Sequence, residues 1–243
     1  MDARLEPGLR LYAIGDVHGC LDLLEDLLAR ILADLADWAG RTRLVFLGDY
    51  VDRGEASAAV VERLAGGPAA LGLPEGSELV VLKGNHEEFL LRSLEEEEAL
   101  PTWLANGGDA TCASYGLDPR SLLRGLRPLA GLRLALRRAL PAAHRSFLER
   151  LPLSHQAGDY FFCHAGVRPG VPLARQEPHD LLWIREPFLS ARDDFGKVVV
   201  HGHTPTARPQ LQDNRIGIDT GAVYGGRLTA VSLEGGERRF LHV

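Results

Sequence analysis

The stretch that decides the fold is residues 9–38, which read LRLYAIGDVHGCLDLLEDLLARILADLADW. Its opening apolar run predicts a β-strand that ends at the turn beginning with Gly15. Residues 21–38 then repeat Leu, Ile and Ala at helical spacing with charged residues between them, which predicts an amphipathic helix ended by Gly40. A strand, a polar turn and a helix in this order are typical of the start of an α/β fold.

The same pattern recurs twice. Residues 43–47 predict a second strand, followed by a turn at Asp49 and a helix near 56–65, and residues 79–82 predict a third strand, followed by a turn at Asn85 and another helix. This βαβαβα order predicts right-handed crossovers and a sheet with helices on its faces.

The rest of the chain divides into a helical part and a strand-rich part. Residues 95–155 are rich in Leu, Arg and Ala and predict a helical insertion. Gly225-Gly226 and Gly235-Gly236 suggest hairpins in an antiparallel C-terminal part. With no internal repeat or linker, we expect a single domain over residues 1–243. Further strands are expected at 160–163, 197–200, 215–218, 228–233 and 239–243.

Composition excludes several classes of protein. The net charge of −6 gives no electrostatic reason to expect binding to nucleic acid or to an anionic membrane. The three cysteines have no C-x-x-C spacing, which argues against a disulfide framework or a zinc ribbon. The first residues carry charges and lack an apolar core, so we expect no signal peptide and a cytoplasmic location. Nothing in the sequence indicates an oligomeric state.

Five short blocks combine glycine with Asp, Asn or His, and each follows an apolar run. Because ligands gather beyond the carboxyl ends of strands in α/β sheets, one sheet edge could bring all five together. Asp, Asn and His without Cys form a ligand set for hard or borderline divalent metals. The blocks therefore predict a two-metal hydrolase. They are GDVHG (15–19), GDYVDRG (48–54), GNHE (84–87), HAG (164–166) and GHT (202–204).

The residue types in the blocks also suggest separate roles in metal binding, phosphate binding and acid catalysis. Arg53 is a natural clamp for phosphate, because guanidinium forms planar bidentate bonds with its oxygens. His86 could protonate a leaving alkoxide, with Asp52 orienting it. The candidate ligands are Asp16 and His18 for one ion, Asn85, His164 and His203 for the other, and Asp49 as the bridge.

These blocks, in this order, resemble the phosphoprotein phosphatase family of metallophosphoesterases. Stretches such as LLWIREPFL (181–189) and IDTGAVYGGRL (218–228) are similar to its short bacterial and phage branch. The resemblance implies the calcineurin-like fold, two mixed β-sheets flanked by helices. It also implies the metal ligands and acid named above, phosphate binding by Arg53 and Arg185, and a place for Tyr224 beside the site.

The implied activity is a phosphomonoesterase that acts on phosphoserine or phosphothreonine in proteins, with phosphotyrosine as an additional candidate substrate, by direct attack of a metal-bridging water. Mn²⁺ suits the ligand set, and Fe or Zn could substitute. The alternative is a dinucleoside polyphosphate hydrolase, such as one acting on diadenosine polyphosphates. Asp52 and Glu87 favour the phosphatase, since the second motif of the alternative usually lacks that Asp and its third reads GNHD. A catalytically inactive binding domain ranks low, because no expected ligand is missing. Any redox role of Cys20 or Cys163 stays open.

Overall fold

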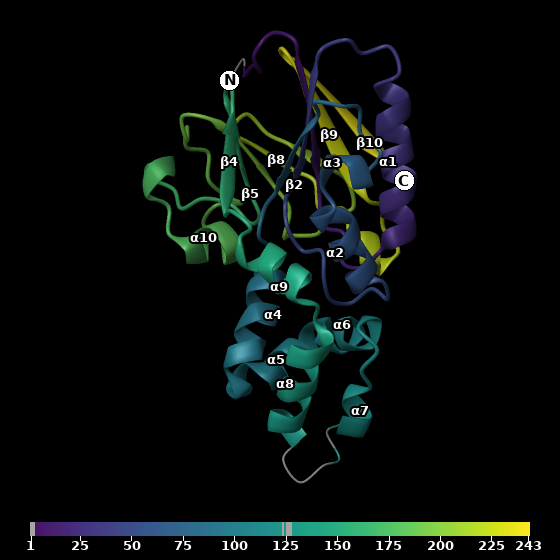
Figure 1. Cartoon of the computed structure of the whole chain (residues 1–243). Coiled ribbons are helices and arrows are strands. Elements are labelled where there is room, and N and C mark those ends of the chain that lie inside the picture. The colour runs from purple at the N-terminus through teal and green to yellow at the C-terminus, as the bar shows by residue number, and fades with distance from the viewer. Residues whose placement is uncertain (1–2, 123, 125–127) are drawn as a thin grey trace.

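The computed structural model describes residues 3–122, 124 and 128–243, and its strands form two mixed sheets (Figure 1). The first sheet, in spatial order, consists of β10 (Glu237–His242), β9 (Thr229–Glu234), β1 (Leu9–Ile14), β2 (Arg41–Phe46) and β3 (Glu78–Val81). The second consists of β4 (Ser154–Ala157), β5 (Tyr160–Cys163), β6 (Val198–His201), β8 (Arg215–Gly217) and β7 (Gln210–Leu211). In each sheet three neighbouring strands are parallel, and antiparallel pairs add the others.

The two sheets pack face to face, and the core between them is apolar. Leu11 and Val45 from the first sheet are buried in one cluster with Phe162, Val200 and Ile216 from the second. These residues alternate along their strands with residues that face outward, as the two-residue period of a strand requires. The predicted pair of mixed sheets flanked by helices is therefore confirmed.

Helices cover the outer faces of both sheets. Helices α1 (Leu21–Asp34) and α2 (Ser57–Ala65) share a buried cluster with the outward residues of β1 and β2, and a short α3 (Gly67–Ala70) follows α2. Helix α10 (Pro178–Trp183) packs on β5 and β6, preceded by the 3₁₀ turn Leu173–Arg175. No helix in the described ranges has both the length and the apolar character that crossing a membrane requires.

The remaining helices gather at one end of the sheets (Figure 1). The predicted helical insertion over 95–155 corresponds to most of this group, although its last residues form β4 instead, and residues 123 and 125–127 lie outside the described part. The group consists of α4 (Asn85–Glu95), the 3₁₀ turn Glu97–Ala99, α5 (Leu100–Trp103), the π-helical turn Leu104–Gly108, α6 (Asp109–Ser114), α7 (Pro119–Leu122), α8 (Pro128–Ala139) and α9 (Ala142–Glu149).

One of the two predicted hairpins is wrong. Gly235-Gly236 does join the antiparallel pair β9 and β10. Gly225-Gly226 instead ends the 3₁₀ turn Ala222–Tyr224 and lies on the connection from β8 to β9, which belong to different sheets. The glycine pair marks a sharp bend in both cases, but only long-range pairing decides whether the flanking strands meet.

Candidate active site

The five polar blocks lie together because of the strands that precede them. Strands β1, β2 and β3 are parallel, and so are β5 and β6, so each set of blocks leaves its sheet at one edge. Backbone hydrogen bonds join the blocks to one another. The His18 N–H donates to the Asp49 carbonyl at 2.8 Å, and the Gly202 N–H donates to the His164 carbonyl at 2.8 Å.

Backbone strain is concentrated in these blocks. In the described part of the chain, a positive φ outside glycine occurs only at residues that the sequence singles out as site candidates. Each such conformation costs on the order of 1–3 kcal/mol and persists only where the surroundings enforce it. The fold therefore holds these side chains in place at a cost in stability. They are His18 (φ 44°), Asp49 (58°), Asp52 (71°), Arg53 (71°) and His203 (64°).

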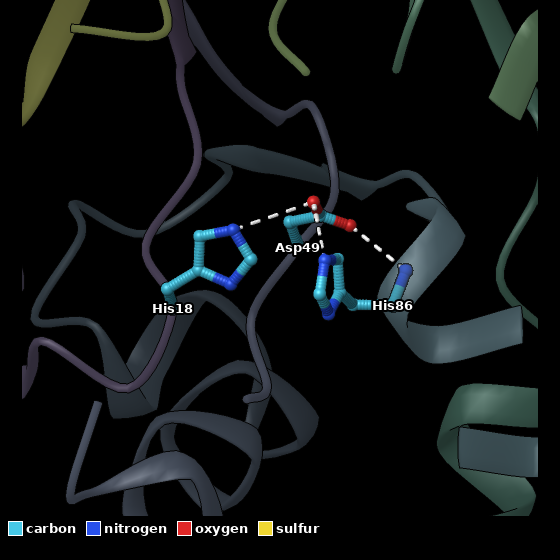
Figure 2. A group of neighbouring side chains, drawn as sticks. All are labelled: His18, Asp49 and His86. Carbon is cyan, nitrogen blue, oxygen red and sulfur yellow. Dashed lines mark hydrogen bonds and ion pairs between the residues drawn. The ribbon is translucent and has the colours of Figure 1, made fainter. Parts of the chain in front are cut away.

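On one side of Asp49 lie two histidines (Figure 2). His18 Nε2 is 3.4 Å and His86 Nε2 is 3.9 Å from the same Asp49 carboxylate oxygen. The Nδ1 of His18 lies 2.8 Å from the Val51 carbonyl, so it carries the proton and leaves Nε2 with its lone pair. Burial lowers the pKa of His18 to about 3, which keeps the ring neutral, the form that binds metal.

On the other side, four candidate donor atoms converge. The Asn85 carbonyl oxygen lies 2.8 Å from His164 Nε2 and 2.9 Å from His203 Nδ1, and Asp49 Oδ1 lies 3.4 Å from His164 Nε2. His164 Nδ1 faces the Leu47 carbonyl at 3.1 Å, so one ring proton lies there and Nε2 is the nitrogen that faces the Asn85 oxygen. A cation is needed between these two atoms, either a proton on Nε2 or, in its place, the divalent metal that these donors prefer.

The electrostatics of the centre also favour a cation. Four carboxylates, at Asp16, Asp49, Glu87 and Asp219, are buried around it. Burial raises the pKa of Asp16 well above its ordinary value, and the neighbouring Asp219 raises it further. At His164 burial lowers the pKa, but Asp49 and Asp16 raise it more strongly, to about 9. Buried negative charge of this density requires positive partners.

Asp16 is the candidate ligand that belongs to neither of the two groups of donors described on the two sides of Asp49. Its carboxylate oxygens accept the backbone N–H of His203 at 3.1 and 3.2 Å, and a side chain at Gly202 would collide with it. Its role as a ligand, like that of the other candidates, stays a prediction. Asp219, which follows β8, lies in the same buried group and was not expected from the sequence to belong to the site.

His86 and Asp52 form a buried pair beside this centre. His86 Nδ1 lies 2.7 Å from Asp52 Oδ2. The Asp52 carboxylate also accepts the indole N–H of Trp103 at 2.9 Å and the Thr111 hydroxyl at 2.7 Å. Burial lowers the pKa of His86, but Asp49 and Asp52 raise it above its ordinary value. A larger fraction of the ring therefore carries a proton near neutral pH. The pair has the geometry of an oriented acid.

Three residues that support the site have roles that the sequence did not reveal. The Glu87 carboxylate accepts the backbone N–H groups of Gly84, Asp49, Tyr50 and Val51 at 2.7–3.2 Å, and so holds the Asp49 loop on the start of α4. Trp103 and Thr111 fix Asp52 from the helical group. Of the three, Glu87 alone stands inside one of the five blocks, GNHE.

A cleft of about 500 Å³ opens over the centre, and the candidate phosphate-binding residues lie at it. Arg53 lines the cleft, its N–H donates to the Gly107 carbonyl at 3.0 Å, and its guanidinium reaches 2.5 Å from His18 Nε2. Arg185 is exposed and lines the same cleft. Tyr224 is 63% exposed and stands beside Arg53, whose Cζ is 5.5 Å from the ring centroid.

Known proteins that resemble this chain include enzymes that hydrolyse phosphate compounds. A curated bis(5'-nucleosyl)-tetraphosphatase PrpE [asymmetrical] from Bacillus cereus is 26% identical over 90% of this chain and 88% of its own length. The enzyme of the same name from Bacillus thuringiensis is also 26% identical, with the same coverage.

Solved structures share the fold. A crystal structure described as a candidate diadenosine tetraphosphatase covers 99% of this chain and 98% of its own, at 25% identity and a TM-score of 0.65. A cold-active protein-tyrosine phosphatase from a psychrophilic Shewanella, 18% identical with a TM-score of 0.56 over 98% of this chain and 83% of its own, has a similar fold.

The family profile described as calcineurin-like phosphoesterase matches residues 9–226, a range that contains all five blocks and every candidate site residue. Members of this family are hydrolases that use divalent metal ions, which agrees with the two groups of donors around Asp49. The chain belongs to the calcineurin-like phosphoesterase family.

Proposed function

We propose that this protein hydrolyses dinucleoside tetraphosphates, cleaving them asymmetrically to a nucleoside triphosphate and a nucleoside monophosphate. The observation that carries the proposal is the match to tetraphosphatases of that specificity over about nine-tenths of both chains. In this reaction the oxygen of water bonds to a phosphorus atom while the bond from that phosphorus to a bridging oxygen breaks. The bridging oxygen leaves with the second nucleotide.

The residues of the site have separate tasks in this reaction. Two divalent ions, held by the donors around Asp49, would clamp the phosphoryl group and activate water. Arg53 and Arg185 line the cleft where the phosphate chain would lie and can neutralise its charge. His86, oriented by Asp52, can supply a proton to the departing oxygen. Mn²⁺ is the ion we expect, with Fe or Zn as substitutes.

A protein phosphatase acting on phosphoserine, phosphothreonine or phosphotyrosine is the second candidate, and one observation favours it. The buried Asp52–His86 pair is most valuable when the leaving group is an alkoxide, as in phosphoserine, because an alkoxide departs poorly without a proton. A nucleotide leaves readily as a phosphate anion and needs that help less.

A side-by-side assay separates the two candidates. The Mn²⁺-loaded protein is given diadenosine tetraphosphate or a phosphoserine peptide, and the products are resolved by ion-exchange chromatography. We expect ATP and AMP in equal amounts, a higher kcat/KM for the nucleotide, and loss of both activities on chelation. Release of ADP alone would contradict asymmetrical cleavage, and a higher kcat/KM for the peptide would favour the phosphatase. Turnover of neither substrate would favour the inactive binding domain.

A further inference from the structure

One wall of the cleft carries aromatic rings that hydrolysis of a phosphoester does not require. Trp183 and His179 are four residues apart at α10, and both line the cleft. Their rings stack at an interplanar angle of 24°, with centroids 6.4 Å apart. His179 is exposed and Trp183 is half-buried. Together they present flat apolar surface next to a polar, charged centre.

The indole of Trp183 is held rigidly in that position. Its Nε1–H donates to Glu88 Oε2 at 2.7 Å, and the ring meets Phe89 edge to face at 6.1 Å. The ring also contacts the candidate ligand His203 edge to face at 6.3 Å. Because Glu88 and Phe89 already hold the ring in one orientation, it loses little conformational entropy when a ligand stacks on it and is preorganised for binding.

The same wall carries two arginines. Arg185 follows Trp183 by two residues, and its guanidinium makes no hydrogen bond or ion pair with any of the described residues. Arg168 is held at the wall by two hydrogen bonds to the Asp180 carboxylate, at 2.6 and 2.7 Å. We call Arg168, His179, Trp183 and Arg185 the α10 wall.

Flat apolar surface beside the guanidinium of Arg185 matches the chemistry of a nucleotide, whose base stacks on aromatic rings and whose phosphates bind arginine. A role in packing alone explains the contact of Trp183 with Phe89. It does not explain an exposed His179 stacked beside that ring, or why the pair faces the cleft.

We propose that Trp183 and His179 form a nucleobase-stacking subsite, which holds one nucleoside of the substrate while the phosphate chain extends past Arg185 toward the metal centre. This inference rests on the proposed function and adds to it the residues that distinguish a nucleotide from a bare phosphate chain.

The test compares two inhibitors that differ only in the nucleoside. ATP and inorganic tripolyphosphate are measured as competitive inhibitors of 4-nitrophenyl phosphate hydrolysis by the Mn²⁺-loaded protein. For Trp183→Leu we expect the inhibition constant of ATP to rise roughly 5- to 150-fold, the range for losing one base–aromatic stack, and that of tripolyphosphate to stay constant. His179→Ala should shift ATP alone in the same direction by less, and Trp183→Phe should restore most of the affinity.

Trp38 offers a matched control. Its indole donates to the Arg41 carbonyl and packs on Arg10, where β1 and β2 begin, at the opposite edge of the sheet from the site. Trp38→Leu should leave both inhibition constants unchanged. Bound Mn²⁺ is counted in each variant, because Trp183 touches His203. If Trp183→Leu loses bound Mn²⁺, the inhibition constants of His179→Ala and Trp183→Phe test the subsite in its place.

Each outcome decides the proposal. Equal shifts for ATP and tripolyphosphate, or no shift for ATP, would overturn the subsite even if the wild-type protein cleaves diadenosine tetraphosphate. A selective loss of phosphotyrosine peptide binding with ATP unaffected would also overturn it. A selective loss of ATP binding in a protein that fails to cleave diadenosine tetraphosphate would support the subsite and contradict the proposed function.

Discussion

Replacing Asp52 by Asn tests the leaving-group acid while changing the shape of the site very little. Asp52 Oδ2 lies 2.7 Å from His86 Nδ1, and the carboxylate is fully buried. Asp49 and Asp52 both raise the pKa of His86, so loss of the Asp52 charge lowers that pKa and with it the protonated fraction of the ring near neutral pH. The rate on a substrate that needs the acid should fall toward the level without acid catalysis, a loss of roughly 10²–10⁴-fold at most.

The assay measures kcat/KM for a phosphoserine peptide, for 4-nitrophenyl phosphate and for diadenosine tetraphosphate, with bound Mn²⁺ counted in each preparation. Nitrophenolate and nucleotide leave as stable anions, whereas the serine alkoxide must be protonated. We therefore expect Asp52→Asn to reduce the peptide reaction strongly and the other two only slightly. His86→Asn should show the same bias, and the two changes together should cost little more than His86→Asn alone, because residues acting as a unit lose their joint effect once.

A control variant separates acid catalysis from packing. Thr111 donates to the Asp52 carboxylate at 2.7 Å and accepts the Asp52 N–H at 2.8 Å, so Thr111→Val disturbs the same buried network but keeps the charge. Its melting temperature should fall, while the ratio of the peptide rate to the nitrophenyl rate stays near the wild-type value. Equal losses on all three substrates in Asp52→Asn, at unchanged metal content, would refute the assignment of His86 as the acid.

Three further predictions follow from the site. Asp49→Asn should reduce bound Mn²⁺, measured by atomic absorption, because Asp49 contacts both groups of donors, whereas Arg53→Ala should keep the metal and raise KM. Glu87→Gln should lower the free energy of unfolding by about 2 kcal/mol, measured by urea denaturation, because a carboxamide cannot accept all four backbone N–H groups. Burial raises the pKa of Cys112 to about 12 and raises that of Cys163, so native protein at pH 8 should resist iodoacetamide at both thiols, as mass spectrometry would show.

Most of the sheet could be predicted because its strands are apolar and end at glycine turns. The exceptions are β4 and β7, which were not predicted. The sequence of β4, Ser-His-Gln-Ala, has no apolar alternation, and β7 is only two residues long. Both are edge strands, and their extended form depends on pairing with β5 and β8 rather than on their own propensity.

The residues of the site also divide into those that could be predicted from the sequence and those that could not. Residues inside the five blocks could be named because each block places its side chains on one local turn. Trp103 and Thr111 could not, because they reach Asp52 from residues 51 and 59 positions away through the packing of the helical group. Asp219 follows a strand whose position in the second sheet only the tertiary structure reveals. Local pattern therefore predicts the chemistry, and long-range packing decides how each group is held.

The choice between the two candidate functions depends on the α10 wall more than on the Asp52–His86 pair. An oriented acid accelerates departure of any poorly leaving oxygen and does no harm when the leaving group is a nucleotide, so the pair is compatible with both functions. A rigid indole stacked with His179, and flanked by an Arg185 that has no ion pair among the described residues, gives an advantage to a ligand that has a flat ring and phosphate. Phosphoserine and phosphothreonine have no ring, and phosphotyrosine, which has one, is distinguished from a nucleotide by the inhibition test with ATP. If the wall binds nucleosides, the pair serves the release of a nucleotide. If it does not, the pair is the better guide, and phosphoproteins become the substrate to examine.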